Sequence, residues 1–222
     1  MASALVYCQS GGGKTVNSTL VKGKKNLLLC TDNSHVVLNN FKRDNLDIEI
    51  VEHYIDRDNT GRVQKNFAQQ FDESVDTGKY DNIIVDNISD LFDMAILEYD
   101  EQGKIKDPRQ YYQIVYQDLK RLSRKAARQK TNVIFTAWTD IQPIMLADGT
   151  AANRTQPKLP NKILDNILGL TQIVAYINTY GEGTDKKWYY VLAGSQTMYA
   201  KDQLFCRKTC MPEDIFTGEG KK

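Results

Sequence analysis

The stretch "YCQSGGGKT", residues 7–15, decides the fold that we expect for this chain. A short apolar run at residues 4–7 leads into it, and a helical run is expected to begin near Thr15. A strand, a glycine-rich loop ending in Lys-Thr and a helix, in this order, are typical of the phosphate-binding pattern G-x-x-x-x-G-K-[ST]. One position departs from this pattern, because Cys8 stands where the first glycine is expected. The stretch predicts a nucleotide site, and a flexible turn with an exposed lysine is the alternative.

The chemistry of such a loop gives each of its residues a role. Backbone N–H groups of the loop and of the helix N-terminus bind phosphate oxygens, and glycines allow the close approach. Lys14 would contact the β- and γ-phosphates, and the hydroxyl of Thr15 would bind magnesium. The residues that we expect around the nucleotide are Ser10, Gly11, Gly12, Gly13, Lys14, Thr15 and Val16.

A second motif supports the first. The stretch "DNIIVDNISDL", residues 81–91, predicts a buried strand that ends in Asp86, the form of a Walker B strand. Ligands of open α/β sheets bind at the carboxyl ends of the strands, so Asp86 and Thr15 are expected to bind Mg²⁺ together. The position after Asp86 holds Asn87 rather than a glutamate that could activate water.

Apolar runs rich in branched residues recur along the chain. They lie at residues 4–7, 26–30, 48–55, 82–86, 132–138, 172–177 and 188–193. Nearly continuous apolar runs are typical of parallel strands buried on both faces, and their alternation with helical stretches indicates an α/β sheet. The clearest helix is predicted over residues 107–130, with Asp107 as its cap. The last two runs flank "NTYGEGTDKK", residues 178–187, and predict a C-terminal antiparallel hairpin on a mostly parallel sheet flanked by helices.

The composition fits one soluble domain. A chain of 222 residues with 41% hydrophobic content can bury a full core, so we expect a single domain over residues 1–222 with a flexible tail at about 212–222. Four scattered cysteines and two histidines form neither a disulfide framework nor a zinc site, which favours a reducing cytoplasm. No apolar run is long enough to span a membrane, and a net charge of +1 gives no global attraction to nucleic acid.

The order of these parts resembles the RecA-like ATPase core. In chain length and in the sequences of its motifs, the chain resembles the compact phage-encoded P-loop ATPases. The resemblance covers roughly residues 4–205 and is carried by "GGGKT", "NIIVDNISDL" and "YAKDQLF". Some members of this group act beside single-strand annealing proteins in phage recombination. The resemblance therefore implies ATP and Mg²⁺ as ligands, single-stranded DNA as a partner, a homo-oligomer, and an annealing or single-strand binding protein as a further partner.

The resemblance also implies catalytic roles for Lys14 and for three further residues. Asp32, in "NLLLCTDNS", falls where RecA-like proteins place their catalytic glutamate. Thr136, in "FTAW" at residues 135–138, falls where the γ-phosphate is sensed. Lys201, in "AKDQ" at residues 200–203, resembles the lysine that such subunits insert into a neighbour's site, although Gln203 replaces the arginine that follows. A surface lysine is the alternative for Lys201.

Two segments correspond to the mobile loops with which RecA-like proteins bind single strands. They are residues 97–107 and residues 139–162, and the second contains three basic residues, Arg154, Lys158 and Lys162. Basic side chains in such a loop suit salt-dependent contacts with phosphates. An ordinary surface loop is the alternative.

Two other functions stay open from the sequence. A P-loop kinase for a small molecule or nucleotide would use the same loop, although residues 139–162 contain a single arginine rather than an arginine-rich lid. A nucleotide-dependent binding module with little hydrolysis would fit the departures at Cys8, Asn87 and Gln203.

Overall fold

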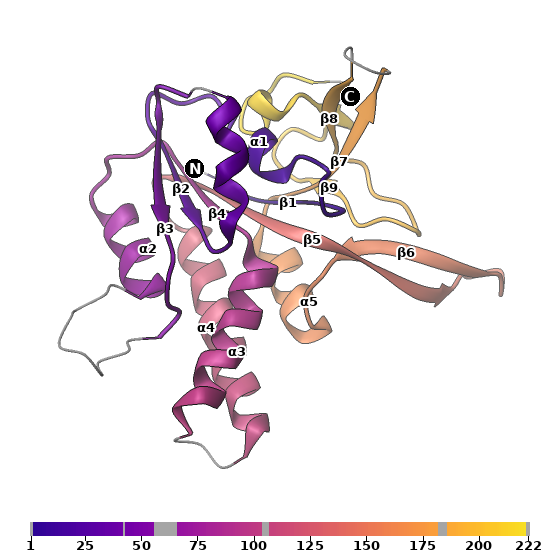
Figure 1. The fold of residues 1–222 in the computed structure, drawn as a ribbon. Coiled ribbons are helices and arrows are strands. Elements are labelled where there is room, and N and C mark those ends of the chain that lie inside the picture. The colour runs from indigo at the N-terminus through magenta and orange to yellow at the C-terminus, as the bar shows by residue number, and fades with distance from the viewer. Residues whose placement is uncertain (1, 42, 56–65, 104–106, 182–185, 221–222) are drawn as a thin grey trace.

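A computed structural model describes residues 2–41, 43–55, 66–103, 107–181 and 186–220 (Figure 1). Its sheet runs in the order β10-β8-β7-β1-β5-β4-β2-β3, with β6 paired to β5 and β9 paired to β7. The strands are β1 (Ser3–Cys8), β2 (Asn26–Cys30), β3 (Leu46–Ile50), β4 (Asn82–Asp86), β5 (Asn132–Met145), β6 (Ala151–Pro157), β7 (Ile173–Tyr180), β8 (Lys187–Val191), β9 (Lys201–Asp202) and β10 (Thr209–Cys210). Strands β7, β1, β5, β4, β2 and β3 are joined by parallel pairs, while β8 pairs antiparallel with β7. The predicted α/β class with a terminal hairpin is confirmed; residues 182–185, in the predicted turn, lie outside the described residues.

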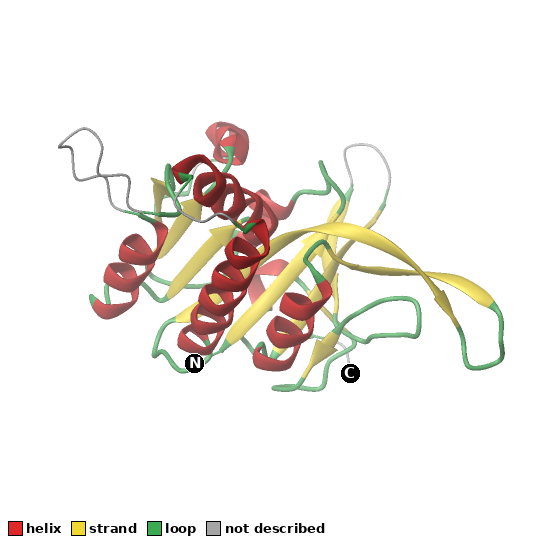
Figure 2. Cartoon of the chain, turned by 90° about the horizontal axis from the view of Figure 1, so that it is seen from below, coloured by secondary structure: helices red, strands yellow, loops and turns green. Residues whose placement is uncertain are grey.

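Helices cover both faces of this sheet (Figure 2). They are α1 (Lys14–Ser18), α2 (Phe67–Asp76), α3 (Ile88–Gln102), α4 (Pro108–Ala126) and α5 (Asn161–Leu170), with 3-10 turns η1 (Asn33–Asn40) and η3 (Pro212–Asp214). Apolar side chains of α2, α3, α4 and α5 share one core with one face of the strands, and residues near α1, η1 and the C-terminus share the other. In the described part of the chain, none of the helices has the length and apolar character that crossing a membrane requires.

The predicted helix at residues 107–130 forms, and its start is as expected. The Asp107 carboxylate accepts a hydrogen bond from the backbone N–H of Arg109 at 3.0 Å, and Pro108 occupies the first turn. Val115 and Leu119 are buried against the sheet, as their helical spacing indicates. The helix ends at Ala126, four residues before the predicted boundary at 130.

The prediction of a loop at residues 97–107 is wrong for its first half. Helix α3 continues to Gln102, because Ala95 and Glu98 are buried and anchor its second half. Gly103, with a φ of 59°, then ends the helix in the left-handed conformation. Residues 104–106 lie outside the described residues.

The prediction of an irregular loop at residues 139–162 is also wrong. Strand β5 continues past the sheet and pairs with β6 in an antiparallel register from Thr139–Pro157 to Met145–Ala151. This β5–β6 hairpin projects from the body of the molecule in both views (Figures 1 and 2). Its turn contains Gly149 with a φ of 82°, a conformation that glycine adopts without strain.

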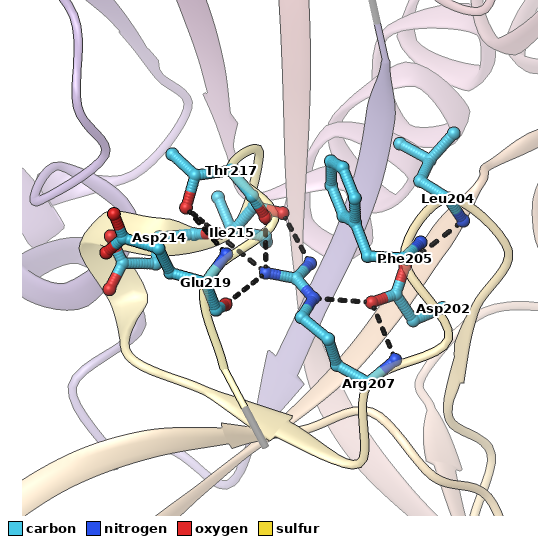
Figure 3. Close-up of polar contacts among 8 residues, drawn as sticks. All are labelled: Asp202, Leu204, Phe205, Arg207, Asp214, Ile215, Thr217 and Glu219. Atoms are coloured by element: carbon cyan, nitrogen blue, oxygen red, sulfur yellow. Dashed lines mark hydrogen bonds and ion pairs between the residues drawn. The ribbon is translucent and has the colours of Figure 1, made fainter. Parts of the chain in front are cut away.

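The C-terminal segment is held in place by one buried arginine (Figure 3). Arg207 Nε donates to Asp202 Oδ2 at 2.6 Å, and both side chains are fully buried. The guanidinium also donates to the backbone carbonyl groups of Asp214, Ile215, Thr217 and Glu219 at 2.7–2.9 Å. Within the tail that was expected to be flexible, residues 212–222, four carbonyl groups of the segment 214–219 thus hydrogen-bond to the body through Arg207; residues 221 and 222 lie outside the described part.

Candidate nucleotide-binding site

The glycine-rich loop lies at the carboxyl end of β1, in the middle of the sheet between β5 and β7. Gly13 has a φ of 86° and immediately precedes α1. A Cβ atom at this position would lie 2.7 Å from Asn17 Nδ2 and 3.1 Å from Trp188 Nε1. Both the backbone conformation and the crowding require glycine here.

The thiol of Cys8 explains why this loop can begin without a glycine. A Cβ atom built on Gly12 would lie 2.5 Å from Cys8 Sγ, so the thiol fills space that a side chain at position 12 would need. Burial raises the pKa of the Cys8 thiol, and the nearby Lys14 charge offsets this only in part. Cys8 is therefore a neutral packing residue of the loop, and Gly12 accommodates it.

Lys14 turns inward over the loop. Its side chain is buried, and its Nζ atom donates hydrogen bonds to the backbone carbonyl groups of Cys8 and Gln9, both at 3.3 Å. These are weak, long contacts for an ammonium group. The ammonium group is thus held where a phosphate could replace the carbonyl contacts.

Asp86 lies opposite the loop, at the end of β4, and is almost completely buried. Its Oδ2 accepts hydrogen bonds from Thr15 Oγ1 at 2.6 Å and from Ser34 Oγ at 2.9 Å, and its Oδ1 accepts one from the Thr136 hydroxyl. Burial raises the pKa of Asp86, and the three hydroxyl donors act in the opposite direction. The structure thus brings Thr15 and Asp86 together from positions 71 residues apart.

Asp32 also reaches this site, from the end of β2. It is the N-cap of η1, where its Oδ1 accepts from the backbone N–H of Ser34 at 2.7 Å. Its Oδ2 accepts from Asn87 Nδ2 at 3.0 Å. Its carboxylate is therefore held by two donors from different elements.

These groups surround one cavity of about 340 Å³. Its lining residues are Ser10, Gly11, Gly13, Lys14, Thr15, Val16, Asp32, Ser34, Val37, Phe41, Asp86, Asn87, Trp138 and Trp188. Gly12 is not among the lining residues, and Thr136 lies behind Asp86 with no exposed surface. Thr136, expected to sense the γ-phosphate, could therefore act only through Asp86.

Four lining residues have roles that the sequence did not suggest, namely Ser34, Val37, Phe41 and Trp188. The first three lie on or beside η1, and Trp188 comes from β8, where no motif draws attention to it. A hydroxyl two residues after Asp32 was the one available signal for Ser34. The apolar side chains close the cavity at its edges, as is common in ligand sites.

The oxygen donors at this site suit Mg²⁺. Hard cations prefer hydroxyl and carboxylate oxygens, and magnesium in phosphate sites uses one or two protein ligands together with the phosphate. Thr15 and Asp86 supply such a pair, with a buried carboxylate whose charge a cation would compensate. Among the described residues, no cluster of three or more His, Cys, Asp or Glu side chains is arranged to hold a metal by itself.

Lys201 lies outside this cavity. It is on β9, in register with Val174 of β7, and its Nζ contacts Gln203 Oε1 at 3.3 Å. Partial burial lowers the pKa of Lys201. The structure does not bring Lys201 to the loop of its own chain.

The three basic residues of the expected DNA-binding segment do not converge. Arg154, on β6, donates to the Gln196 carbonyl group and to the Tyr199 hydroxyl, both at 3.0 Å. Lys158 follows β6 with its Nζ 4.9 Å from the centre of the Trp138 ring, and Lys162 is exposed on α5. Only Lys158 lies beside the cavity, through Trp138.

The root of the β5–β6 hairpin is joined to α3 by one hydroxyl. Ser89 Oγ donates to the Lys158 carbonyl group at 2.9 Å and accepts from the Trp138 backbone N–H at 3.1 Å. Ser89 lies three residues after Asp86, in the first turn of α3. The two strands of the hairpin are therefore fixed to the helix that begins at the nucleotide site.

Comparison with known proteins agrees with this geometry. A KaiC-like protein from the hyperthermophilic archaeon Pyrococcus horikoshii OT3 has a similar structure, with a TM-score of 0.50 and 12% identity over 88% of this chain and 79% of the other. The flagellar accessory protein FlaH from Methanocaldococcus jannaschii matches with a TM-score of 0.47 and 12% identity, over 94% and 83% of the two chains. No curated protein sequence matches the chain significantly.

The fold is thus similar to that of KaiC-like P-loop ATPases, a mostly parallel sheet with the glycine-rich loop at its centre. The likeness at 12% identity concerns the fold and not a substrate. A family model described as AAA domain matches residues 1–204. The chain therefore belongs to the AAA domain family of P-loop proteins.

Proposed function

We propose that this protein binds ATP with Mg²⁺ and hydrolyses it, as a RecA-like ATPase acting on single-stranded DNA in phage recombination or replication. The observation that carries the ATP site is the 2.6 Å hydrogen bond between Thr15 and the buried Asp86, beside an inward-pointing Lys14. A hydroxyl and a carboxylate in contact beside a glycine-rich loop form the arrangement that a nucleoside triphosphate with its metal needs.

Each residue has a defined task in this proposal. The N–H groups of residues 10–16 bind the phosphate oxygens, except that of Gly12, which donates to the Gln9 carbonyl group at 3.0 Å. Lys14 exchanges its carbonyl contacts for the β- and γ-phosphates. Thr15 and Asp86 would hold the magnesium ion, which compensates charge on the phosphate oxygens when it is bound. Asp32 accepts the proton of the attacking water, because it is the carboxylate of the cavity that is free of the Thr15 contact.

The partners are a second part of the proposal. Lys201 lies on β9, outside the cavity of its own chain, and its proposed role is in the site of a neighbouring subunit, in a homo-oligomer. The projecting β5–β6 hairpin, with Arg154 on it and Lys158 and Lys162 at its base, is the proposed contact for single-stranded DNA. A single-strand annealing or single-strand binding protein is the proposed protein partner, and the host cytoplasm the proposed location.

Phosphate release from ATP, measured with and without single-stranded DNA, tests this function. We expect release that DNA stimulates. Release only in the presence of a small phosphate acceptor would instead identify a kinase, and tight ATP binding without turnover would identify a binding module.

The matched variants are Lys14→Ala and Lys24→Ala, which remove a buried loop lysine and an exposed lysine. Lys14→Ala should abolish ATP binding at an unchanged melting temperature, while Lys24→Ala should bind normally. Equal ATP affinity of both variants and the wild type would remove this loop from consideration.

A further inference from the structure

Asn87 occupies the position after the Walker B aspartate and is buried, with 1% of its surface exposed. Its Oδ1 accepts a hydrogen bond from the backbone N–H of Asp90 at 2.7 Å, so it is the N-cap of α3. Serine and aspartate cap helices as well as asparagine does. Capping alone therefore does not explain why this side chain carries an amide.

The other end of the amide contacts Asp32. Asn87 Nδ2 donates to Asp32 Oδ2 at 3.0 Å, while the Ser34 backbone N–H holds Oδ1 at 2.7 Å. Among the good capping residues, asparagine is the one that supplies an acceptor and an N–H donor from the same side chain. The two contacts together fix both oxygens of the Asp32 carboxylate and therefore its plane.

The backbone of Asn87 is tied to the same strand end. Its N–H donates to Thr31 Oγ1 at 3.1 Å, and the Thr31 backbone N–H donates to the Asp86 carbonyl group at 2.9 Å. Thr31 directly precedes Asp32, so the end of β2 and the start of α3 are held as one unit. The amide of Asn87 is thus placed against Asp32 by contacts that do not involve the amide.

We propose that Asn87 is a positioning residue, which holds the carboxylate of Asp32 in the orientation that water activation requires. This inference rests on the proposed role of Asp32 in hydrolysis. Orientation of a reacting group decides large factors in rate, and a misplacement of about 1 Å can reduce turnover about 100-fold.

A double-mutant cycle tests the proposal. Asn87→Ser keeps a capping oxygen and removes the amide donor, and Asn87→Asp keeps the shape but turns a carboxylate oxygen toward Asp32. We expect kcat to fall about 10- to 100-fold in Asn87→Ser and further in Asn87→Asp, with KM for ATP changed less than about twofold. In an Asp32→Asn background, the same substitutions should change kcat less than about twofold, because the group that they position is gone.

Asn66→Ser is the control, because Asn66 caps α2 by the same type of contact but lines no part of the cavity. It should leave kcat unchanged, and the melting temperature of each variant reports on the cap. Should Asn87→Ser melt early, Asn87→Asp decides the outcome, since it keeps both cap and shape.

The outcomes separate the inference from the function on which it rests. Unchanged kcat in Asn87→Ser, beside an Asp32→Asn variant whose kcat is strongly reduced but measurable, would overturn the positioning role alone. The same holds if Asn87→Ser lowers kcat equally in both backgrounds, or raises KM instead. Equal turnover of the wild type and Asp32→Asn would remove Asp32 from the mechanism, and the positioning role with it.

Discussion

Replacement of Arg207 by methionine should destabilise the protein severely, although the residue lies far along the chain from the glycine-rich loop. The side chains of Arg207 and Asp202 are completely buried, and the guanidinium also satisfies four backbone carbonyl groups. In Arg207→Met the Asp202 carboxylate stays buried without its charged partner. Removal of one member of a buried ion pair costs about 3–5 kcal/mol.

This loss is large relative to the whole stability of a domain, which is about 5–15 kcal/mol. A change of about 4 kcal/mol corresponds to a melting temperature about 8–16 °C lower for a chain of this size. Thermal unfolding followed by circular dichroism measures it directly. Arg124→Met is the control, because Arg124 is exposed on α4 and its loss should cost less than about 0.5 kcal/mol.

The double variant Asp202→Asn/Arg207→Met gives a second measurement. It removes both charges, so it should be more stable than Arg207→Met alone. A loss below about 1 kcal/mol in Arg207→Met, or a double variant that is the less stable of the two, would refute the reasoning. Either result would mean that the C-terminal segment is held by its apolar contacts and not by the guanidinium.

Three further results are expected. Both tryptophans of the chain, Trp138 and Trp188, line the cavity, so ATP with Mg²⁺ should change the intrinsic fluorescence; an unchanged spectrum at saturating ATP would contradict the site. Gly12→Ala should weaken ATP binding through overpacking of about 1–3 kcal/mol against the Cys8 thiol, and Cys8→Gly should restore most of the affinity. Burial raises the pKa of Asp202, but the hydrogen bonds from Arg207 and from backbone N–H groups outweigh it and hold the pKa below its usual value. The contribution of Asp202 to the free energy of unfolding is therefore complete above about pH 3.9, and it is lost as the pH falls through the lower pKa of the folded state. Acid unfolding of Asp202→Asn should lack this pH dependence.

The central strands of the sheet could be predicted because they are largely apolar and buried. Residues 26–30 and 82–86 are buried on both faces, so sequence and structure agree to the residue. Of the residues expected around the nucleotide, all but Gly12 line the common cavity, because the loop motif defines their local backbone geometry. The strand predicted at residues 48–55 differs from the observed β3, which spans Leu46–Ile50, because β3 is an edge strand with exposed residues and a weak apolar pattern.

The β5–β6 hairpin was missed for a physical reason. Beyond Trp138 the strand leaves the sheet, so neither face is buried in a core and the pattern of apolar residues disappears. Pro143 also argued against a strand, although Asp148-Gly149 was a turn signal that could have been used. The contacts of Asn87 and Arg207 could not be predicted, because they join positions that come together only in the tertiary structure.

The hydroxyl of Ser89 couples helix α3 mechanically to the β5–β6 hairpin. It hydrogen-bonds to Trp138 in β5 and to Lys158 directly after β6, so a shift of the first turn of α3 also moves the root of the hairpin. Near the root, β6 is also bound to the segment at residues 195–199: Arg154 donates to the Gln196 carbonyl group at 3.0 Å, and the backbone N–H of Thr155 donates to the Thr197 carbonyl group at 2.8 Å. A shift at the start of α3 would therefore have to move the hairpin and residues 195–199 together before it reached the outermost turn.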